Sequence, residues 1–289
     1  MLSLTTEQLF KKILPTIERY VGYALRIQKG IHSQDKGDST DNEAIRAFTD
    51  ADVIVQEGIA RDLKKILDEG YSFRFVPEEE SPYNHLFPKE SPITVTLDPI
   101  DGTLLFKRGY PGFCTILAKY VNGYLDGVLV HNATNGATYC ATQDEEQSWI
   151  WRPTRERGKY TKTQWQVLPG NNKIISMNVP EEQAEALRER GIELLQFGTP
   201  EIPPDLEMNA MCHGKIGGYF KLQASAFDWG PFSLIVKNGG GFVSDFQGNE
   251  HSIQRYWGRN DGTKEGNTPS IIAVADKRLH ETLVDVLSR

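Results

Sequence analysis

Two carboxylates three positions apart, followed by a glycine and a threonine, make up the run Asp98-Pro99-Ile100-Asp101-Gly102-Thr103. The residues before it, 93–97, are rich in β-branched side chains and predict a buried strand. Because Pro99 fixes φ and cannot donate to a sheet, we expect the backbone to leave the sheet here and both carboxylates to face one point. Gly102 allows a ligand to approach closely, and Thr103 suits a helix N-cap, where N–H groups can bind an anion. The run therefore predicts a metal ion that bridges to a phosphate; an Asp-Pro turn followed by an Asx-capped turn is the alternative.

The composition is that of a soluble globular protein, with 289 residues, 39% apolar and 25% charged. No run of apolar residues approaches 18, and the start lacks the basic and apolar regions of a signal peptide, so we expect a cytoplasmic protein without a membrane partner. The three widely spaced cysteines, Cys114, Cys140 and Cys212, predict reduced core residues. A net charge of −7 disfavours binding to nucleic acid polymers.

Helical periodicity predicts two helices before the Asp98 run. They cover about residues 5–28, and a segment from Thr49 or Asp50 to Gly70. A capping box should begin the first helix, and Pro15 should kink it. The polar, glycine-containing residues 29–43 indicate a mobile loop, and residues 72–76 a short strand.

Two Asn-Gly dipeptides, Asn122-Gly123 and Asn135-Gly136, separate three apolar runs and predict an antiparallel meander. After it, the charged and irregular stretch 143–166 is where we place a boundary. The division is between an N-terminal α+β part (1–155) that carries the metal motif and a C-terminal α/β part (156–289), with the site at their junction.

Strands and helices alternate from residue 173 onward, which favours a layered α/β architecture. The expected strands cover 173–177, 193–197, 216–222, 241–246 and 270–275, and the helices cover 180–190, 205–212, 227–237 and a last segment capped by Asp276.

Four motifs together resemble the inositol monophosphatase superfamily, which comprises metal-dependent, lithium-sensitive phosphomonoesterases. The Asp98 run is similar to its D-P-[IL]-D-G-[TS] signature, and Glu79-Glu80-Ser81 to its G-E-E-[SD] element. Phe227-Asp228-Trp229 with residues 238–245 resembles its second signature, and Thr49-Asp50-Ala51-Asp52 its T-x-A-D motif. The resemblance implies a homodimer and an αβαβα sandwich of the inositol monophosphatase/fructose-bisphosphatase type.

The same resemblance implies a set of metal ligands. Glu79, Asp98 and the carbonyl of Ile100 would bind one Mg²⁺, while Asp98, Asp101 and Asp228 would bind a second, and a weaker third ion would lie near Glu79. Mn²⁺ is expected to substitute. The register of the glutamate is open by one residue, because three glutamates stand in a row, Glu78-Glu79-Glu80.

Further roles follow from the resemblance for water and phosphate. Glu79 and Thr103 would hold the nucleophilic water, and the N–H groups of Gly102 and Thr103 would hold the phosphate. Oxygen ligands suit Mg²⁺, and the chain has no paired His/Cys set for zinc. Since clustered carboxylates repel one another, we expect a loose metal-free site that metal binding stabilises.

Lys221 stands seven residues before Asp228, where inositol monophosphatases usually have a glutamate that contacts a ring hydroxyl. A cation there would favour a substrate with additional negative charge; an exposed lysine at a strand end, without a role, is the alternative. Lys107 and Arg108, directly after the motif, could contact a second phosphate or form a solvated pair.

The sequence therefore predicts a Mg²⁺-dependent phosphomonoesterase that hydrolyses a small phosphorylated metabolite. Inositol monophosphatase-like, 3′(2′),5′-bisphosphate nucleotidase and sugar-bisphosphatase activities remain open. Two alternatives are not enzymes: a catalytically silent sensor of a phosphorylated ligand, and a module stabilised by Mg²⁺ or Ca²⁺.

Overall fold

The outer layer of the N-terminal part consists of α1 (Thr6–Ile27) and α3 (Asp50–Asp68) in the computed structural model of the chain. The structure describes residues 4–28, 33–35, 47–110, 112–156, 158–169, 171–177, 179–196, 207–222, 224–249 and 270–289. The capping box of Thr5 and Gln8 is confirmed, and α1 continues past Pro15, so the kink stays a prediction. Much of the predicted loop 29–43 lies outside the described residues, but the loop prediction missed β1 (Ser33–Asp35), which pairs with β2 (Ala47–Thr49).

A sheet of seven strands forms the next layer, with the order β3-β4-β5-β6-β7-β8-β9. Its strands are β3 (Arg74–Pro77), β4 (Ile93–Asp101), β5 (Cys114–Val121), β6 (Tyr124–Asn132), β7 (Thr138–Thr142), β8 (Ser148–Pro153) and β9 (Tyr160–Trp165). A short 3₁₀ helix, η2 (Asn84–Leu86), follows β3. The predicted meander is confirmed, and its first turn places Asn122 at φ 51° and Gly123 at φ 86°, the left-handed conformations of a type I′ hairpin.

The stretch 143–166 is not irregular as predicted, because it supplies β8 and β9, which extend the same sheet. The predicted boundary at 155/156 thus falls between two paired strands. The first sheet continues to Trp165, and the second begins at Lys173.

A sheet of five strands, with the order β11-β10-β12-β14-β13, and its helices form the C-terminal part. The elements are β10 (Lys173–Met177), α5 (Glu181–Glu189), β11 (Glu193–Gln196), α6 (Glu207–Cys212), β12 (Gly218–Lys221), α7 (Trp229–Asn238), β13 (Phe242–Ser244), β14 (Ile271–Val274) and α8 (Lys277–Leu287). All nine were predicted, and Asp276 caps α8 through its side chain as expected.

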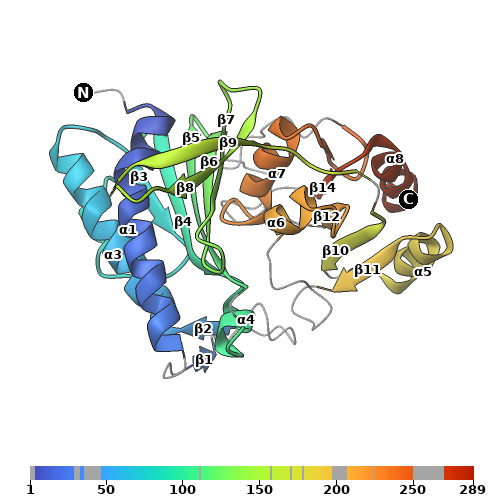
Figure 1. The fold of residues 1–289 in the computed structure, drawn as a ribbon, viewed down its shortest axis with the longest axis horizontal. Helices are drawn as coiled ribbons and strands as arrows, with labels where there is room; N and C mark the ends of the chain where they lie inside the picture. Colours follow the sequence, from blue (N-terminus) through green and yellow to red (C-terminus); the bar gives the residue numbers. More distant parts are fainter. Residues whose placement is uncertain are drawn as a thin grey trace.

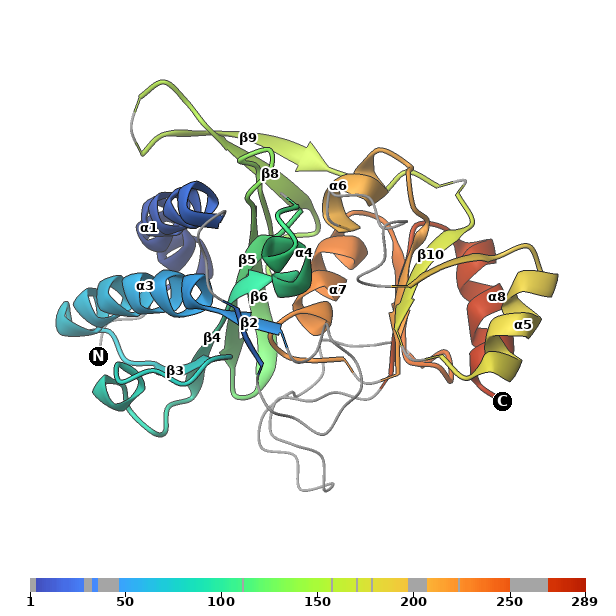
Figure 2. The ribbon, with the colours of Figure 1, turned by 90° about the horizontal axis from the view of Figure 1, so that it is seen from below.

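Three apolar cores bind these elements into five layers, which confirms the αβαβα sandwich. The first core lies between α1, α3 and the seven-stranded sheet, and the second lies between the two sheets around α7. The third packs α5 and α8 on the outer face of the five-stranded sheet. Figures 1 and 2 show this order of layers, with α7 between the sheets.

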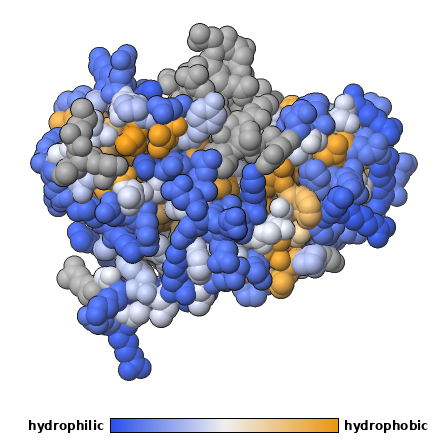
Figure 3. Space-filling view, turned by 90° about the horizontal axis from the view of Figure 1, so that it is seen from above, coloured by the Kyte–Doolittle hydropathy of each residue, from blue (hydrophilic) through white to orange (hydrophobic). Residues whose placement is uncertain are grey.

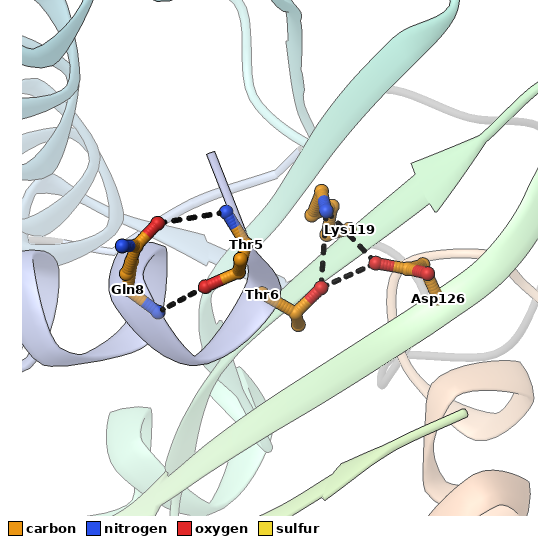
Figure 4. A network of polar contacts seen from close by, with 5 residues as sticks. All are labelled: Thr5, Thr6, Gln8, Lys119 and Asp126. Atoms are coloured by element: carbon orange, nitrogen blue, oxygen red, sulfur yellow. Dashed lines mark hydrogen bonds and ion pairs between the residues drawn. The ribbon is translucent and has the colours of Figure 1, made fainter. Parts of the chain in front are cut away.

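A buried polar network fixes the start of α1 on the seven-stranded sheet (Figure 4). Lys119 Nζ donates to Thr6 Oγ1 at 3.0 Å and to Asp126 Oδ2 at 2.8 Å, and the Thr6 hydroxyl also donates to Asp126. A Cβ on Gly127 would lie 2.4 Å from Thr6 Cγ2, so only glycine permits this close approach. The helix layer is thus anchored to β5 and β6 by charge as well as by apolar packing.

The surface and the cysteines agree with the composition. Figure 3 shows a mostly hydrophilic face with a few separate apolar groups. Over the described residues, none of the helices combines the length and apolar character needed to cross a membrane. Cys114 and Cys140 are buried thiols outside any disulfide, and Cys212 is a half-buried one.

Candidate active site

Asp98 and Asp101 lie on the same face of β4 because the strand contains one extra residue between them. The strand does not leave the sheet at Pro99 as predicted; it continues to Asp101. Opposite it on β5, Asp98 pairs with Ile116 and Asp101 with Cys114, so three steps on β4 match two steps on β5. Without this bulge, residues three apart would point to opposite faces. Both carboxylates therefore face the core between the sheets, where Ile116 and Cys114 are buried.

Hydrogen bonds hold the bulge in shape. The Ile100 N–H donates to Asp98 Oδ1 at 3.0 Å, and the Thr115 hydroxyl donates to the carbonyl of Pro99 at 2.7 Å. The thiol of Cys114 donates to Asp101 Oδ2 at 3.6 Å. The backbone that places both carboxylates is thus tied to the neighbouring strand and to its own side chains.

Gly102 is the N-cap of α4 (Thr103–Lys107), and Thr103, predicted as the N-cap, is the first residue of the helix instead. Gly102 takes a left-handed conformation with φ 89°, which a side chain would strain. The Thr103 hydroxyl donates to the carbonyl of Ile100 at 2.8 Å and lies 3.5 Å from Asp52 Oδ1. Thr103 therefore links a predicted metal-binding carbonyl to a buried carboxylate on α3.

The pairing of β3 with β4 decides which glutamate faces Asp98. Pro77 stands beside Leu97 in this parallel pair, and the Glu78 N–H donates to the Leu97 carbonyl at 2.8 Å. Val76 packs into the core between the sheets, and Glu78 comes directly after the end of β3 two residues later. Glu78 is exposed, yet it lies near enough to Asp98 for its charge to raise the pKa of Asp98. Glu79, the predicted ligand, is half-buried, and the side chain of Gln56 holds its backbone.

Asp228 approaches the same point from the other half of the chain. It caps α7, and its side chain accepts the N–H of Trp229. Lys221, the last residue of β12, places Nζ 3.8 Å from Asp228 Oδ2 and 5.2 Å from the centre of the Trp229 ring. The Lys221 side chain is only 19% exposed, which does not fit the alternative of a solvated strand-end lysine. Lys107 and Arg108, in contrast, are exposed.

Electrostatics show that these carboxylates crowd one another. The pKa of Asp98 is raised well above its usual range by burial and by the charges of Glu78, Asp101, Asp228 and Asp52. Burial also raises the pKa of Asp228, whereas the Lys221 ammonium and the Trp229 N–H lower it. Bound cations would relieve this repulsion, because an opposite charge favours the ionised carboxylate.

The donors fit Mg²⁺ by their chemistry, since they are carboxylate and carbonyl oxygens. Within the part of the chain that the structure describes, however, no three His, Cys, Asp or Glu side chains already stand together as a ligand set. The residues thus share one region without a completed coordination shell.

Three residues in this region were missing from the predicted site. Glu78 was kept only as a neighbouring alternative to Glu79, and its signal lies in the β3–β4 register. Asp52 was named only as part of the T-x-A-D motif, and it lies next to Thr103. Gln56 lies one turn after Asp52 on α3, and nothing in its residue type distinguished it.

Comparisons with known proteins relate the chain to one family. The sequence model of the inositol monophosphatase family matches residues 5–289. The "Nus factor SuhB" of Pasteurella multocida is 25% identical over 232 residues, which cover 77% of this chain and 80% of that protein. The inositol monophosphatase of Dictyostelium discoideum is 24% identical over 227 residues, 73% of this chain and 76% of that protein.

Solved structures of similar fold cover nearly the whole chain. A lithium-soaked staphylococcal inositol monophosphatase-1 superimposes with a TM-score of 0.70 at 17% identity, covering 99% of this chain and 96% of its own. An IMPase/NADP phosphatase with Mg²⁺ and phosphate gives 0.68 at 17% identity, with coverage of 97% and 95%. An IMPase/NADP phosphatase with NADP and Ca²⁺ gives 0.69 at 18% identity, with coverage of 99% and 97%. At these identities the likeness establishes the fold.

Proposed function

The chain belongs to the inositol monophosphatase family, and from this premise we propose that it is a Mg²⁺-dependent phosphomonoesterase acting on a small phosphate ester. The observation that carries the proposal is the position of Asp98, which is buried at 5% exposure and whose pKa is raised by burial and by the charges of four other carboxylates. Such a cluster would be costly to keep ionised without cations. A phosphate dianion, in turn, needs cations to enter an acidic site.

We assign the metal ligands by the face on which each side chain lies. Asp98, Asp101, Asp228 and the carbonyl of Ile100 keep the roles predicted from the sequence, and Glu78 takes the role first given to Glu79. Two or three ions would be bound, as in the family. When bound, Mg²⁺ polarises the phosphate and lowers the pKa of water.

The remaining residues orient the reactants in this proposal. Thr103, fixed by the carbonyl of Ile100 and near Asp52, would align the attacking water together with Glu78. The N–H groups of Gly102 and Thr103 would hold the phosphate. Because Gly102 turns the chain out of the bulge into α4, these groups follow directly after the metal-binding carboxylates.

The decisive test is phosphate release from inositol monophosphates, adenosine 3′,5′-bisphosphate, fructose 1,6-bisphosphate and simple sugar phosphates, with and without Mg²⁺ and lithium. We expect Mg²⁺-dependent, lithium-sensitive turnover that Asp98→Asn reduces to less than about a tenth. Asp68→Asn, the same change at the exposed end of α3, is the matched control and should keep full activity. Turnover by the Asp98 variant at the wild-type level would contradict the proposal.

Lys221 favours a second candidate, hydrolysis of an ester that carries a further anionic group. Its ammonium is held next to Asp228, and a solved relative of this fold is described in complex with NADP, which has several phosphates. We expect Lys221→Met to reduce kcat/KM for bisphosphates about tenfold more than for monophosphates, since one charge-assisted contact contributes roughly 1.5 kcal/mol. An equal loss of kcat/KM for bisphosphates and monophosphates would show that Lys221 interacts with Asp228 and does not contact a second phosphate.

A homodimer, a cytoplasmic location and the absence of a nucleic acid partner remain proposals from the family resemblance and the composition. The names of several relatives support the sensor alternative, because these relatives are called Nus factors and not phosphatases. A folded, Mg²⁺-binding protein that releases phosphate from none of these esters would favour it.

A further inference from the structure

Gln56 makes a paired hydrogen bond with the backbone of one residue in the candidate site. Its Nε2 donates to the carbonyl of Glu79 at 2.7 Å, and its Oε1 accepts the Glu79 N–H at 3.1 Å. The side chain is fully buried. An amide is the group suited to this task, because it donates and accepts at once without a charge.

The clamp lies directly after the glutamate that faces Asp98. On one side of Glu78, its own N–H is fixed to the Leu97 carbonyl of β4. On the other side, Glu79 is fixed by Gln56, and Asn84 Nδ2 lies 3.5 Å from the same Glu79 carbonyl. The backbone of Glu78 is thus held at both neighbouring peptide groups, and this fixes the direction of its Cα–Cβ bond.

Such a restraint is needed because like charges act against the position of Glu78. Its charge raises the pKa of both Asp98 and Asp228, and β3 has ended one residue earlier. Because Glu78 is exposed, a free loop could move its carboxylate further from the two aspartates and so lower the repulsion. A neutral clamp from α3 opposes this movement without adding a further negative charge.

The same helix serves both sides of the site. Asp52 lies one turn before Gln56, on the same face of α3, and its carboxylate lies next to the Thr103 hydroxyl. The helix α3 therefore contacts the segment after β3 through Gln56 and the start of α4 through Asp52.

We propose that Gln56 is a positioning residue that holds Glu78 in place as a Mg²⁺ ligand. The inference rests on the proposed function, in which Glu78 binds the metal. Residues that orient a metal ligand typically contribute 10- to 100-fold to metal affinity, and we expect an effect of that size.

Isothermal titration of the purified protein with Mg²⁺ alone tests the inference without any substrate. Gln56→Met keeps the volume of the side chain but loses both hydrogen bonds, and it should raise the Kd for Mg²⁺ about 10- to 100-fold. The two hydrogen bonds are only partly buried, so the variant should fold. Ile66→Val, ten residues further along the same buried face of α3, is the control for a general loss of packing and should leave the Kd within about twofold.

A double-mutant cycle separates positioning from a structural role. In a Glu78→Gln background, Gln56→Met should cause no further loss of Mg²⁺ affinity, because the ligand that it positions is gone. If Gln56→Met is too unstable for titration, Gln56→Leu is the second variant, and the Mg²⁺-induced shift in its Tm is measured instead. The inference is overturned if Gln56→Met binds Mg²⁺ like the wild type, or if its loss persists undiminished in the Glu78→Gln background. Failure of the wild-type protein itself to bind Mg²⁺ would reject the proposed function and this role together.

Discussion

One extra residue in β4 decides what Asp98 and Asp101 can do together. The sequence indicated both aspartates and their convergence, but it attributed the convergence to a strand that ends at Pro99. In the structure the pairing with β5 continues to Asp101, and the bulge turns both side chains to one face. The two aspartates could therefore be predicted from the sequence. The β-bulge between them could not, because it depends on pairing with β5, which follows later in the chain.

The glutamate shows the same limit more sharply. Three consecutive glutamates carry no local signal that tells one from the next. Only the register of Pro77 beside Leu97, together with the clamp from Gln56, separates Glu78 from Glu79. The resemblance to the family indicated the element but left its register open.

Single substitutions test this assignment. Glu78→Gln should lower kcat/KM about 100-fold or more, a loss of roughly 3 kcal/mol in transition-state stabilisation, because a metal ligand is removed. Glu79→Gln is the matched change one residue away and should stay within about threefold of the wild type, since the Gln56 bonds involve only its backbone. Steady-state kinetics at saturating Mg²⁺ would decide, and the reverse order of effects would restore the original register.

At the scale of elements, periodicity predicted the helices and strands that have regular burial and missed those that do not. The alternating C-terminal half has buried strands with capped helices between them, so each element carried its own signal. By contrast, β9 exposes most of its side chains and β8 has a mixed pattern, so their charged sequence indicated loop. These strands are held by pairing with neighbours, which local composition does not encode.

The β6–β7 pair contains a titratable group that should make stability depend on pH. His131 is buried at 5% exposure opposite Thr138, with Nδ1 2.9 Å from the Thr138 hydroxyl, and burial lowers its pKa to about 4. Between pH 4 and the ordinary pKa of 6.5, the unfolded chain binds more protons at this histidine than the folded protein. The free energy of unfolding should therefore fall as the pH drops from 6.5 toward 4, by about 3 kcal/mol from this residue.

Urea unfolding across this pH range, with the wild type and His131→Phe, would measure that contribution. The variant should lose the histidine-dependent part of the slope, although it costs about 1 kcal/mol at all pH values by leaving the Thr138 hydroxyl unpaired. His85→Gln changes an exposed histidine and serves as the control that keeps the wild-type slope. Equal slopes for the wild type and His131→Phe would show that this histidine is not responsible.

At the scale of the whole molecule, the candidate site joins the two halves of the chain. Asp98 and Asp101 belong to the seven-stranded sheet, and Glu78 directly follows its strand β3. Asp228 caps the helix between the sheets, and Lys221 ends a strand of the five-stranded sheet. The five layers could be predicted from the alternation and the resemblance. The boundary between the two parts could not be predicted, because β8 and β9 extend the first sheet past residue 155.

A site shared between halves predicts that metal binding stabilises the entire fold. A ligand bound only by the folded state adds about 2.7 kcal/mol at a concentration 100 times its Kd, which raises Tm by roughly 4–5 °C in a chain of 289 residues. We expect Mg²⁺ to raise Tm by that amount and EDTA to reverse it, as measured by calorimetry in matched ionic strength. Asp98→Asn and Asp228→Asn remove ligands from opposite halves, so each should abolish most of the shift, whereas Asp68→Asn should retain it. If Asp228→Asn kept the full shift while Asp98→Asn lost it, the metal would be bound by the first sheet alone and the two halves would not be linked through it.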